Sequence, residues 1–308
     1  MKPILVTCYV SPDLDGTAGA IAYAEFLTKT GVNCEAGIIG EPHDEAKYIF
    51  ERFGFAYPKF IPNSDAYNQV IIVDASSLNG LEGKVTPEKV IEIIDHRKIN
   101  EAEKFPDAKV QIELVGSAAT LITEKFIQNT ISISKESATL LYGAIISNTL
   151  NFKGTITTDR DKKAAQWLNS IIGLKEGFWK ELFIAKSDLT GKKLEARIRG
   201  DFARFEIGGK KIGIAQIEII GVKKLLTGRE TEIQEVLNKI KAEMDLDLIF
   251  QNTIELEGGK NFFITNDTQA KNLLERVFDI KFIGNTAERP NLIMRKQIVP
   301  LIMNVLEK

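Results

Sequence analysis

Acidic side chains follow three separate apolar runs of this sequence, and one of only two histidines follows the third run. They are Asp13 and Asp15 after residues 3–10, Asp74 after residues 70–73, and Asp95-His96-Arg97 after residues 90–94. Because the carboxyl ends of parallel strands share one edge of an open sheet, we expect these side chains to meet in one place. Buried carboxylates repel one another unless cations neutralise them. The spacing therefore predicts a divalent-metal site.

Each residue of this set has an expected part in the site. Asp13 and Asp15 are two apart, so that each could face a different cation, and Asp74 could bridge the two. His96 would supply a neutral nitrogen ligand, and Asp95 could orient its ring. A lone aspartate at one strand end is more often a turn residue or helix cap, but three clusters favour metal. Two divalent ions about 3.5–4 Å apart are a common device for activating water against phosphorus.

Four other polar residues allow two interpretations each. Ser117 follows a glycine before a predicted helix, where it could direct backbone N–H groups at an anion or simply cap the helix. Asn148 lies inside an apolar helix, either as a satisfied core amide or with its oxygen facing the metals. Arg295 and Lys296 precede the last predicted helix, where they are either a solvated turn or a phosphate clamp from a second domain.

The elements that must position these residues alternate in the first half of the chain. Strand patterns alternate with helical ones up to about residue 171, which predicts an α/β fold with a doubly wound, mostly parallel sheet. The second half differs: a hairpin is expected around Gly208-Gly209 and an amphipathic helix over 229–244. We therefore predict two domains, residues 1–180 with the metal site and residues 189–308 as a smaller mixed α+β domain.

Composition excludes several classes of protein. The chain has 308 residues, is 44% hydrophobic and 27% charged, and carries a formal net charge of −2. A net charge this close to zero gives no sign of the basic surface that binding extended nucleic acid requires. No run of about 18 apolar residues predicts a membrane span, and the amino terminus lacks the layout of a signal peptide. With only two cysteines in no metal-binding or disulfide pattern, we expect a cytoplasmic protein.

Seven motifs in this order resemble the DHH phosphoesterase superfamily, in the branch whose second domain is of the DHHA2 type. The segments are Ser11-Pro12-Asp13-Leu14-Asp15, Val73-Asp74, Ile94-Asp95-His96-Arg97, Val115-Gly116-Ser117-Ala118-Ala119-Thr120, Ala144 to Leu150, Gly209 to Gln216, and Arg295 to Pro300. That branch holds manganese-dependent inorganic pyrophosphatases, exopolyphosphatases and Prune-like proteins. The resemblance implies an active site in the cleft between two domains, holding up to two Mn²⁺ (or Mg²⁺ or Co²⁺) ions.

The chain departs from the family pattern at several positions. Tyr9 stands where the pyrophosphatases have a metal-binding histidine, Arg97 where they have a second histidine, and Asn148 where they have an aspartate. A substrate lysine expected near residue 203 is replaced by alanine, with Arg204 adjacent. The resemblance therefore implies a degenerate metal site and reduced activity. The neutral Asn148 should weaken metal binding, whereas Arg97 could replace a missing cation in holding a phosphoryl oxygen.

Together these features predict metal-dependent hydrolysis of phosphoanhydride bonds in pyrophosphate or short polyphosphate. The metal ligands would be Asp13, Asp15, Asp74, His96 and Asn148, with Arg97 also catalytic, and the substrate-binding residues would be Arg97, Ser117, Arg204, Arg295 and Lys296. Two alternatives remain: a phosphodiesterase acting on nucleotides or short oligonucleotides, and a catalytically impaired sensor of phosphate ligands. The partner would be a small phosphorylated substrate, and a homodimer is compatible with this interpretation.

Overall fold

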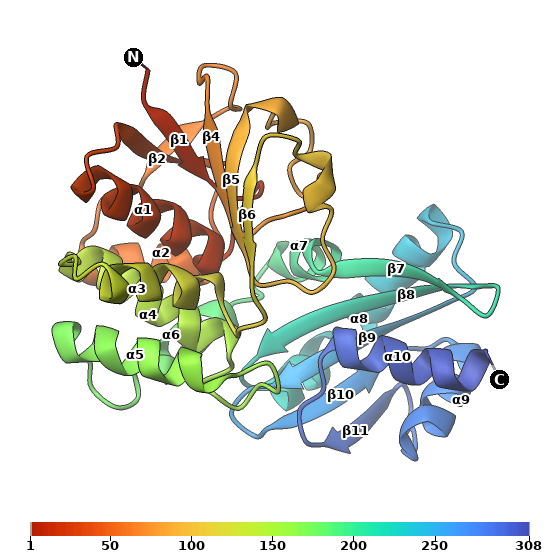
Figure 1. Ribbon diagram of the computed structural model, residues 1–308. Helices are drawn as coiled ribbons and strands as arrows, with labels where there is room; N and C mark the ends of the chain where they lie inside the picture. The colour runs from red at the N-terminus through yellow and green to blue at the C-terminus, as the bar shows by residue number, and fades with distance from the viewer. Residues whose placement is uncertain (1, 308) are drawn as a thin grey trace. The chain divides into compact units, whose positions relative to one another are not determined.

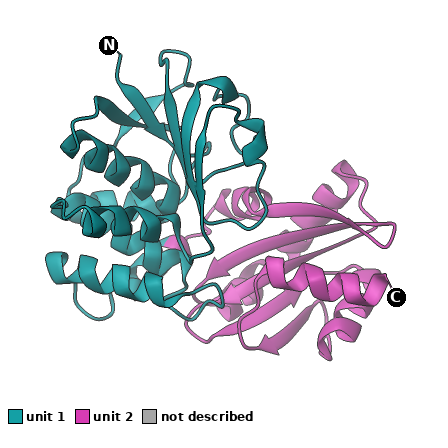
Figure 2. Cartoon of the chain, in the orientation of Figure 1, with its two compact units in different colours: residues 1–185 teal, residues 186–308 magenta. Residues whose placement is uncertain are grey.

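The computed structural model describes residues 2–307 and divides into two compact units, residues 1–185 and residues 186–308 (Figure 2). Each unit is built around a sheet with its own buried apolar core. The candidate metal ligands Asp13, Asp15, Asp74, His96 and Asn148 all belong to the first unit.

The first unit contains a six-stranded sheet in the order β3-β2-β1-β4-β5-β6, and every pairing is parallel. The strands are β1 (Ile4–Thr7), β2 (Cys34–Ile39), β3 (Lys59–Ile61), β4 (Val70–Val73), β5 (Val90–Asp95) and β6 (Lys109–Ile112). Strand order reverses at β1 and β4, as the doubly wound prediction requires. The central strands are short, continuously apolar and buried, because a parallel sheet is covered on both faces.

Helices cover one face of this sheet, and loops with two short 3₁₀ turns cover the other (Figure 1). The helices of the unit are α1 (Leu14–Lys29), α2 (Asp44–Phe53), α3 (Ala118–Gln128), α4 (Lys135–Asn148), α5 (Asp159–Ile172) and α6 (Phe178–Lys186), and the turns are η1 (Pro87–Lys89) and η2 (Ala102–Lys104). On the second face, Leu5, Ile72 and Ile93 pack against loop side chains that include Leu81 and Phe105. The chain leaving β4 and β5 therefore stays close to the sheet edge.

A glycine sets the distance between α1 and β4. A Cβ atom on Gly19 would lie 2.5 Å from Cγ1 of Val73, which is far inside van der Waals contact. The helix backbone thus approaches β4 more closely than any side chain would allow. Asp15 at the start of α1 and Asp74 after β4 are brought near each other by this packing.

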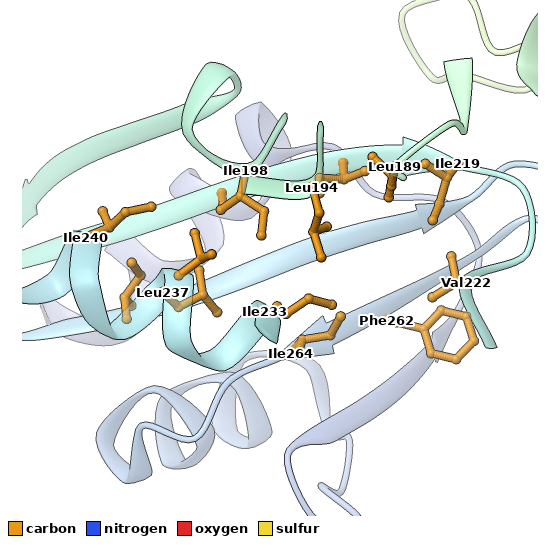
Figure 3. Close-up of a cluster of buried hydrophobic side chains, with 14 of the residues drawn as sticks. Leu189, Leu194, Ile198, Ile219, Val222, Ile233, Leu237, Ile240, Phe262 and Ile264 are labelled. Atoms are coloured by element: carbon orange, nitrogen blue, oxygen red, sulfur yellow. The ribbon is translucent and has the colours of Figure 1, made fainter. Parts of the chain in front are cut away.

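The second unit has a five-stranded sheet in the order β11-β10-β9-β8-β7, antiparallel except for the β8–β9 pair. Its elements are α7 (Lys193–Gly200), β7 (Phe202–Ile207), β8 (Lys210–Ile219), α8 (Val222–Glu243), β9 (Leu248–Glu255), β10 (Lys260–Ile264), α9 (Thr268–Phe278), β11 (Thr286–Pro290) and α10 (Arg295–Leu306). Leu194 and Ile198 of α7 and Ile233, Leu237 and Ile240 of α8 pack on one face of the sheet (Figure 3). Residues of α9 and α10 belong to a separate core cluster.

The α/β prediction, with a smaller mixed domain following, is confirmed. The hairpin forms at Gly208-Gly209, both with positive φ. The predicted helix over 229–244 is the second part of α8, which begins earlier, at Val222, and has non-helical φ and ψ angles at Arg229. The sequence patterns did not predict two edge strands, β3 and β11. Within residues 2–307, no helix is long and apolar enough to cross a membrane.

Candidate metal centre

The predicted acidic clusters lie at the carboxyl edge of the first sheet. Asp13 is the N-cap of α1, Asp74 directly follows β4, and Asp95 is the last residue of β5. Asp74 adopts a left-handed backbone conformation, with φ of 58°, which few residues other than glycine and Asp or Asn accept readily. Potential ligand atoms of Asp15, Asp74 and His96 all lie within 4.8 Å of one another. Three residues from three separate segments therefore form one candidate cation site.

Asp15 is fully buried and is held at the amino terminus of α3. Its Oδ1 accepts hydrogen bonds of 2.8 Å from the Ser117 hydroxyl and from the backbone N–H of Ala119, and its Oδ2 accepts one of 2.8 Å from the N–H of Ala118. The Asn148 amide nitrogen donates to Oδ2 as well, at 2.5 Å. A helix N-terminus favours a negative charge. These four donors fix the carboxylate in one orientation.

Asp74 is the residue whose surroundings are least complete. Its side chain is 1% exposed, yet in the described part of the chain neither carboxylate oxygen accepts a hydrogen bond. His96 Nε2 and Arg97 Nη2 each lie 3.4 Å from its Oδ1. Buried polar atoms normally have partners, and such an exception needs an explanation. A divalent cation beside Asp74 would supply one.

The ring of His96 is oriented so that one nitrogen faces the carboxylates. Its Nδ1 lies 2.9 Å from the carbonyl oxygen of Val115, which can only accept a hydrogen bond. Nδ1 therefore carries hydrogen, and Nε2, 3.8 Å from Asp15 Oδ2, is the nitrogen available to a metal. We expected Asp95 to orient this ring. That expectation was wrong, because Asp95 Oδ1 accepts the backbone N–H of His96 at 2.7 Å instead.

Without a cation, the pKa values of Asp15, Asp74 and His96 are all raised, so that these side chains hold protons more tightly than usual. Burial, and next the charge of Asp74, raise the pKa of Asp15 to about 8. Burial alone would lower the pKa of His96, but its contact with Asp74 and the charges of Asp74 and Asp15 raise it to about 9. Burial also raises the pKa of Asp74, against the opposing effects of Arg97 and His96. Oxygen and imidazole donors with a surplus of negative charge suit Mn²⁺, which would displace these protons.

Asp13 lies beside this three-residue cluster. Its Oδ1 accepts a hydrogen bond of 3.0 Å from the N–H of Gly16, as the side chain of an N-cap residue normally does. The Tyr9 hydroxyl accepts the backbone N–H of Asp13 at 2.9 Å. Burial, followed by the charges of Asp13 and Asp74, raises the pKa of Tyr9 well above its ordinary value, so that its phenol stays neutral and is a poor ligand.

Two predicted roles change with the geometry. Ser117 was assigned to substrate binding, but its hydroxyl and the helix end that it caps hold the Asp15 carboxylate, so the anion at this helix end belongs to the protein. Asn148 was expected to offer an oxygen to the metals. Its nitrogen faces Asp15 instead, and ligation through the oxygen would require the amide to turn over.

Of the predicted substrate-binding residues in the second unit, Arg295 is held by its own surroundings. Arg295 begins α10, and its guanidinium donates to the backbone oxygen of Asp201 at 2.6 Å and to Oδ1 of the same residue at 2.5 Å. Lys296 is exposed beside it, and Arg204 is exposed on β7. A buried amide, Asn261, supports the same segment by binding the N–H and the carbonyl of Ile293.

Comparison with known proteins agrees with this architecture. The family model described as "DHH family, N-terminal domain" matches residues 3–145, and the one described as "DHHA2 domain" matches residues 180–305. A Bacillus cereus protein is 30% identical over 311 residues, covering 98% of each chain. The chain belongs to the DHH family. The Bacillus cereus relative of this DHH protein is named "Probable manganese-dependent inorganic pyrophosphatase", as is a Bacillus cytotoxicus relative with the same identity and coverage.

A solved structure resembles the DHH protein over its whole length. It is the crystal structure of a putative family II inorganic pyrophosphatase from Methanococcus jannaschii, with a TM-score of 0.76, 29% sequence identity and 100% coverage of both chains. The sequence did not indicate the Val115 carbonyl that orients His96, and it did not identify Asp15 as the anion held by the N–H groups of Ala118 and Ala119. The Gly-Ser-Ala-Ala sequence after a strand was the available signal for the latter.

Proposed function

We propose that this DHH protein hydrolyses the phosphoanhydride bond of pyrophosphate or a short polyphosphate, using Mn²⁺. The observation that carries the proposal is Asp74, a buried carboxylate neither of whose oxygens accepts a hydrogen bond from the described residues, beside Asp15 and the Nε2 atom of His96. The names of the relatives support the same substrate. When bound, a divalent cation lowers the pKa of water and neutralises charge on phosphoryl oxygens.

The protein's own residues have separate tasks in this reaction. Asp15, Asp74 and His96 would hold the cation, with the Val115 carbonyl keeping His96 Nε2 toward it. Arg97, whose side chain is 42% exposed, can bind a phosphoryl oxygen through its free N–H groups as water attacks phosphorus and the P–O–P bond breaks. The products are two phosphate groups, and the proton of the attacking water leaves to solvent.

The domain assignment and the second-unit residues stay proposals. We propose that residues 1–180 carry the metal centre and that residues 189–308 bind phosphate through Lys296, Arg295 and Arg204. Lys296 and Arg204 are exposed, whereas Arg295 must exchange its bonds to Asp201 for bonds to substrate. A cytoplasmic location and a homodimer likewise remain predictions.

Phosphate release from pyrophosphate and tripolyphosphate in the presence of Mn²⁺ tests the function. The wild type should release phosphate, whereas Asp74→Asn should lose at least a hundredfold in rate. Asp107→Asn, which removes an exposed carboxylate that contacts none of the proposed ligands in the contacts given above, is the matched control and should be unchanged. Hydrolysis of cyclic nucleotides or dinucleotides, with no phosphate released from pyrophosphate or tripolyphosphate, would favour the phosphodiesterase. Tight binding of polyphosphate without any turnover would favour the sensor.

A further inference from the structure

Two kinds of group face the Asp74 side chain. Asp15 and the Nε2 atom of His96 complete the three-residue cation site, with Nε2 lying 3.4 Å from Asp74 Oδ1. The guanidinium of Arg97 lies against the same residue: Nη1 donates to its backbone oxygen at 2.6 Å, and Nη2 lies 3.4 Å from its Oδ1. A cation bound here would therefore share Asp74 with a permanent positive charge.

Tyr9 supports the guanidinium in that position. The Arg97 Cζ atom lies 5.6 Å from the centre of the Tyr9 ring, within the range of a cation–π contact. The same tyrosine accepts the backbone N–H of Asp13 through its hydroxyl. A neutral phenol that is already engaged in a hydrogen bond is a weak donor to Mn²⁺, which prefers carboxylates and imidazole.

A second cation would therefore find few ligands next to Asp74. Two further carboxylates lie near Tyr9 and Arg97, and both are already engaged. One oxygen of Asp13 caps α1, and Asp95, whose Oδ2 lies 3.7 Å from Arg97 Nη1, accepts hydrogen bonds from the Ser76 hydroxyl and the His96 N–H. Arg97 would repel a divalent ion bound to the shared carboxylate, and its charge cannot be removed by deprotonation. The residues present fit one cation and do not fit two.

We propose that this chain binds a single divalent cation through Asp15, Asp74 and His96, and that Arg97, seated on Tyr9, stands in for a second. The inference rests on the proposed function for its catalytic meaning, since the guanidinium would then hold a phosphoryl oxygen as a metal ion otherwise would. The inference also predicts the number of cations bound per chain, which can be measured without any substrate.

Equilibrium dialysis of the metal-free protein against Mn²⁺ alone, followed by elemental analysis, measures that count. The wild type should saturate at one Mn²⁺ per chain, with an electron paramagnetic resonance spectrum of an isolated ion. The double variant Tyr9→His/Arg97→His should bind two, and the two ions should show exchange coupling. Lys98→His introduces a histidine on an exposed neighbouring side chain and should still bind one.

The wild-type measurement alone can overturn the inference. Two Mn²⁺ ions per wild-type chain, or an exchange-coupled spectrum, would show that Arg97 does not occupy a metal position, and so would no binding at all. Failure of the double variant to gain an ion, with its thermal unfolding still cooperative, would count against the role given to Tyr9 and Arg97. One bound ion without phosphate release would instead leave this inference standing and refute the proposed function.

Discussion

The buried Asp15 carboxylate is predicted to destabilise the metal-free protein, and Asp15→Asn should therefore raise its stability at pH 7. Burial, with the charge of Asp74 next, raises the pKa of Asp15 from 3.8 to about 8. In the unfolded chain this carboxyl loses its proton near pH 3.8, whereas in the folded protein it keeps the proton until about pH 8. The unfolded state therefore binds fewer protons between these values, and the free energy of unfolding falls as pH rises through that window.

The size of the effect follows from the same shift. At pH 7, about three pH units above the unfolded-state pKa, the cost is about 4 kcal/mol at about 1.4 kcal/mol per unit. An asparagine carries no such cost, but its amide nitrogen would face the N–H of Ala118, and an unpaired donor costs about 1–3 kcal/mol. The net gain at pH 7 is about 1–3 kcal/mol, or roughly 2–12 °C in the unfolding midpoint of a unit of this size.

Thermal unfolding of chelator-treated protein followed by circular dichroism measures this gain. At pH 4 the linkage cost falls below about 1 kcal/mol, so the unpaired Ala118 N–H should make Asp15→Asn slightly less stable than the wild type. Added Mn²⁺ should stabilise the wild type and have much less effect on the variant. Asp107→Asn should track the wild type throughout. If Asp15→Asn is less stable than the wild type at both pH 4 and pH 7, the account of Asp15 as a buried carboxyl that is costly to ionise without a cation is refuted.

Three further substitutions probe how the site is held. Gly19→Val should push α1 away from β4 and weaken Mn²⁺ binding at least tenfold in dialysis, whereas a protein that binds normally would show that the close approach is unimportant. Asp161→Ala removes the carboxylate that accepts the Gly116 N–H at 2.9 Å; chemical denaturation should show a loss of about 3 kcal/mol, together with weaker Mn²⁺ binding. Asn261→Ala should lower the free energy of unfolding by about 2–4 kcal/mol and raise KM for pyrophosphate. An unchanged KM would show that the Asn261 amide does not position the segment that carries Arg295 and Lys296.

Sequence patterns were sufficient for most of the first unit because its central strands are buried on both faces. Such strands read as mainly apolar runs: the run before Asp74 ends where β4 ends, and the run before Asp95, interrupted only by Glu92, ends one residue before the end of β5. The edge strands β3 and β11 lack this signal: Lys59–Ile61 is only three residues long, and Thr286–Pro290 is mostly polar. Their pairing depends on neighbouring strands, which no local pattern reports.

The clustering of the proposed ligands was predictable for the same reason, but the groups that hold them were not. Asp15, Asp74 and His96 follow from the rule that parallel strands share a carboxyl edge. The donors to Asp15 come from α3, its N-cap and α4, more than a hundred residues along the chain, and two of them are backbone N–H groups that carry no side-chain signature. For Ser117, the sequence left an anion site and a helix cap as alternatives; the structure unites them, because the anion is a side chain of the protein.

The contact between Tyr9 and Arg97 could not be predicted from the sequence, in which the two residues are far apart. Each stands as an isolated departure from the family pattern, yet the ring of one lies under the guanidinium of the other. A cation–π contact at a partly exposed position is worth only about 0.5–1 kcal/mol, too little to matter for the fold. Its consequence is positional: the ring and the Asp74 carbonyl together fix a mobile, strongly charged side chain against a buried carboxylate. Without the ring, the guanidinium would keep its charge but lose one of the contacts that place it where a second cation would otherwise be needed.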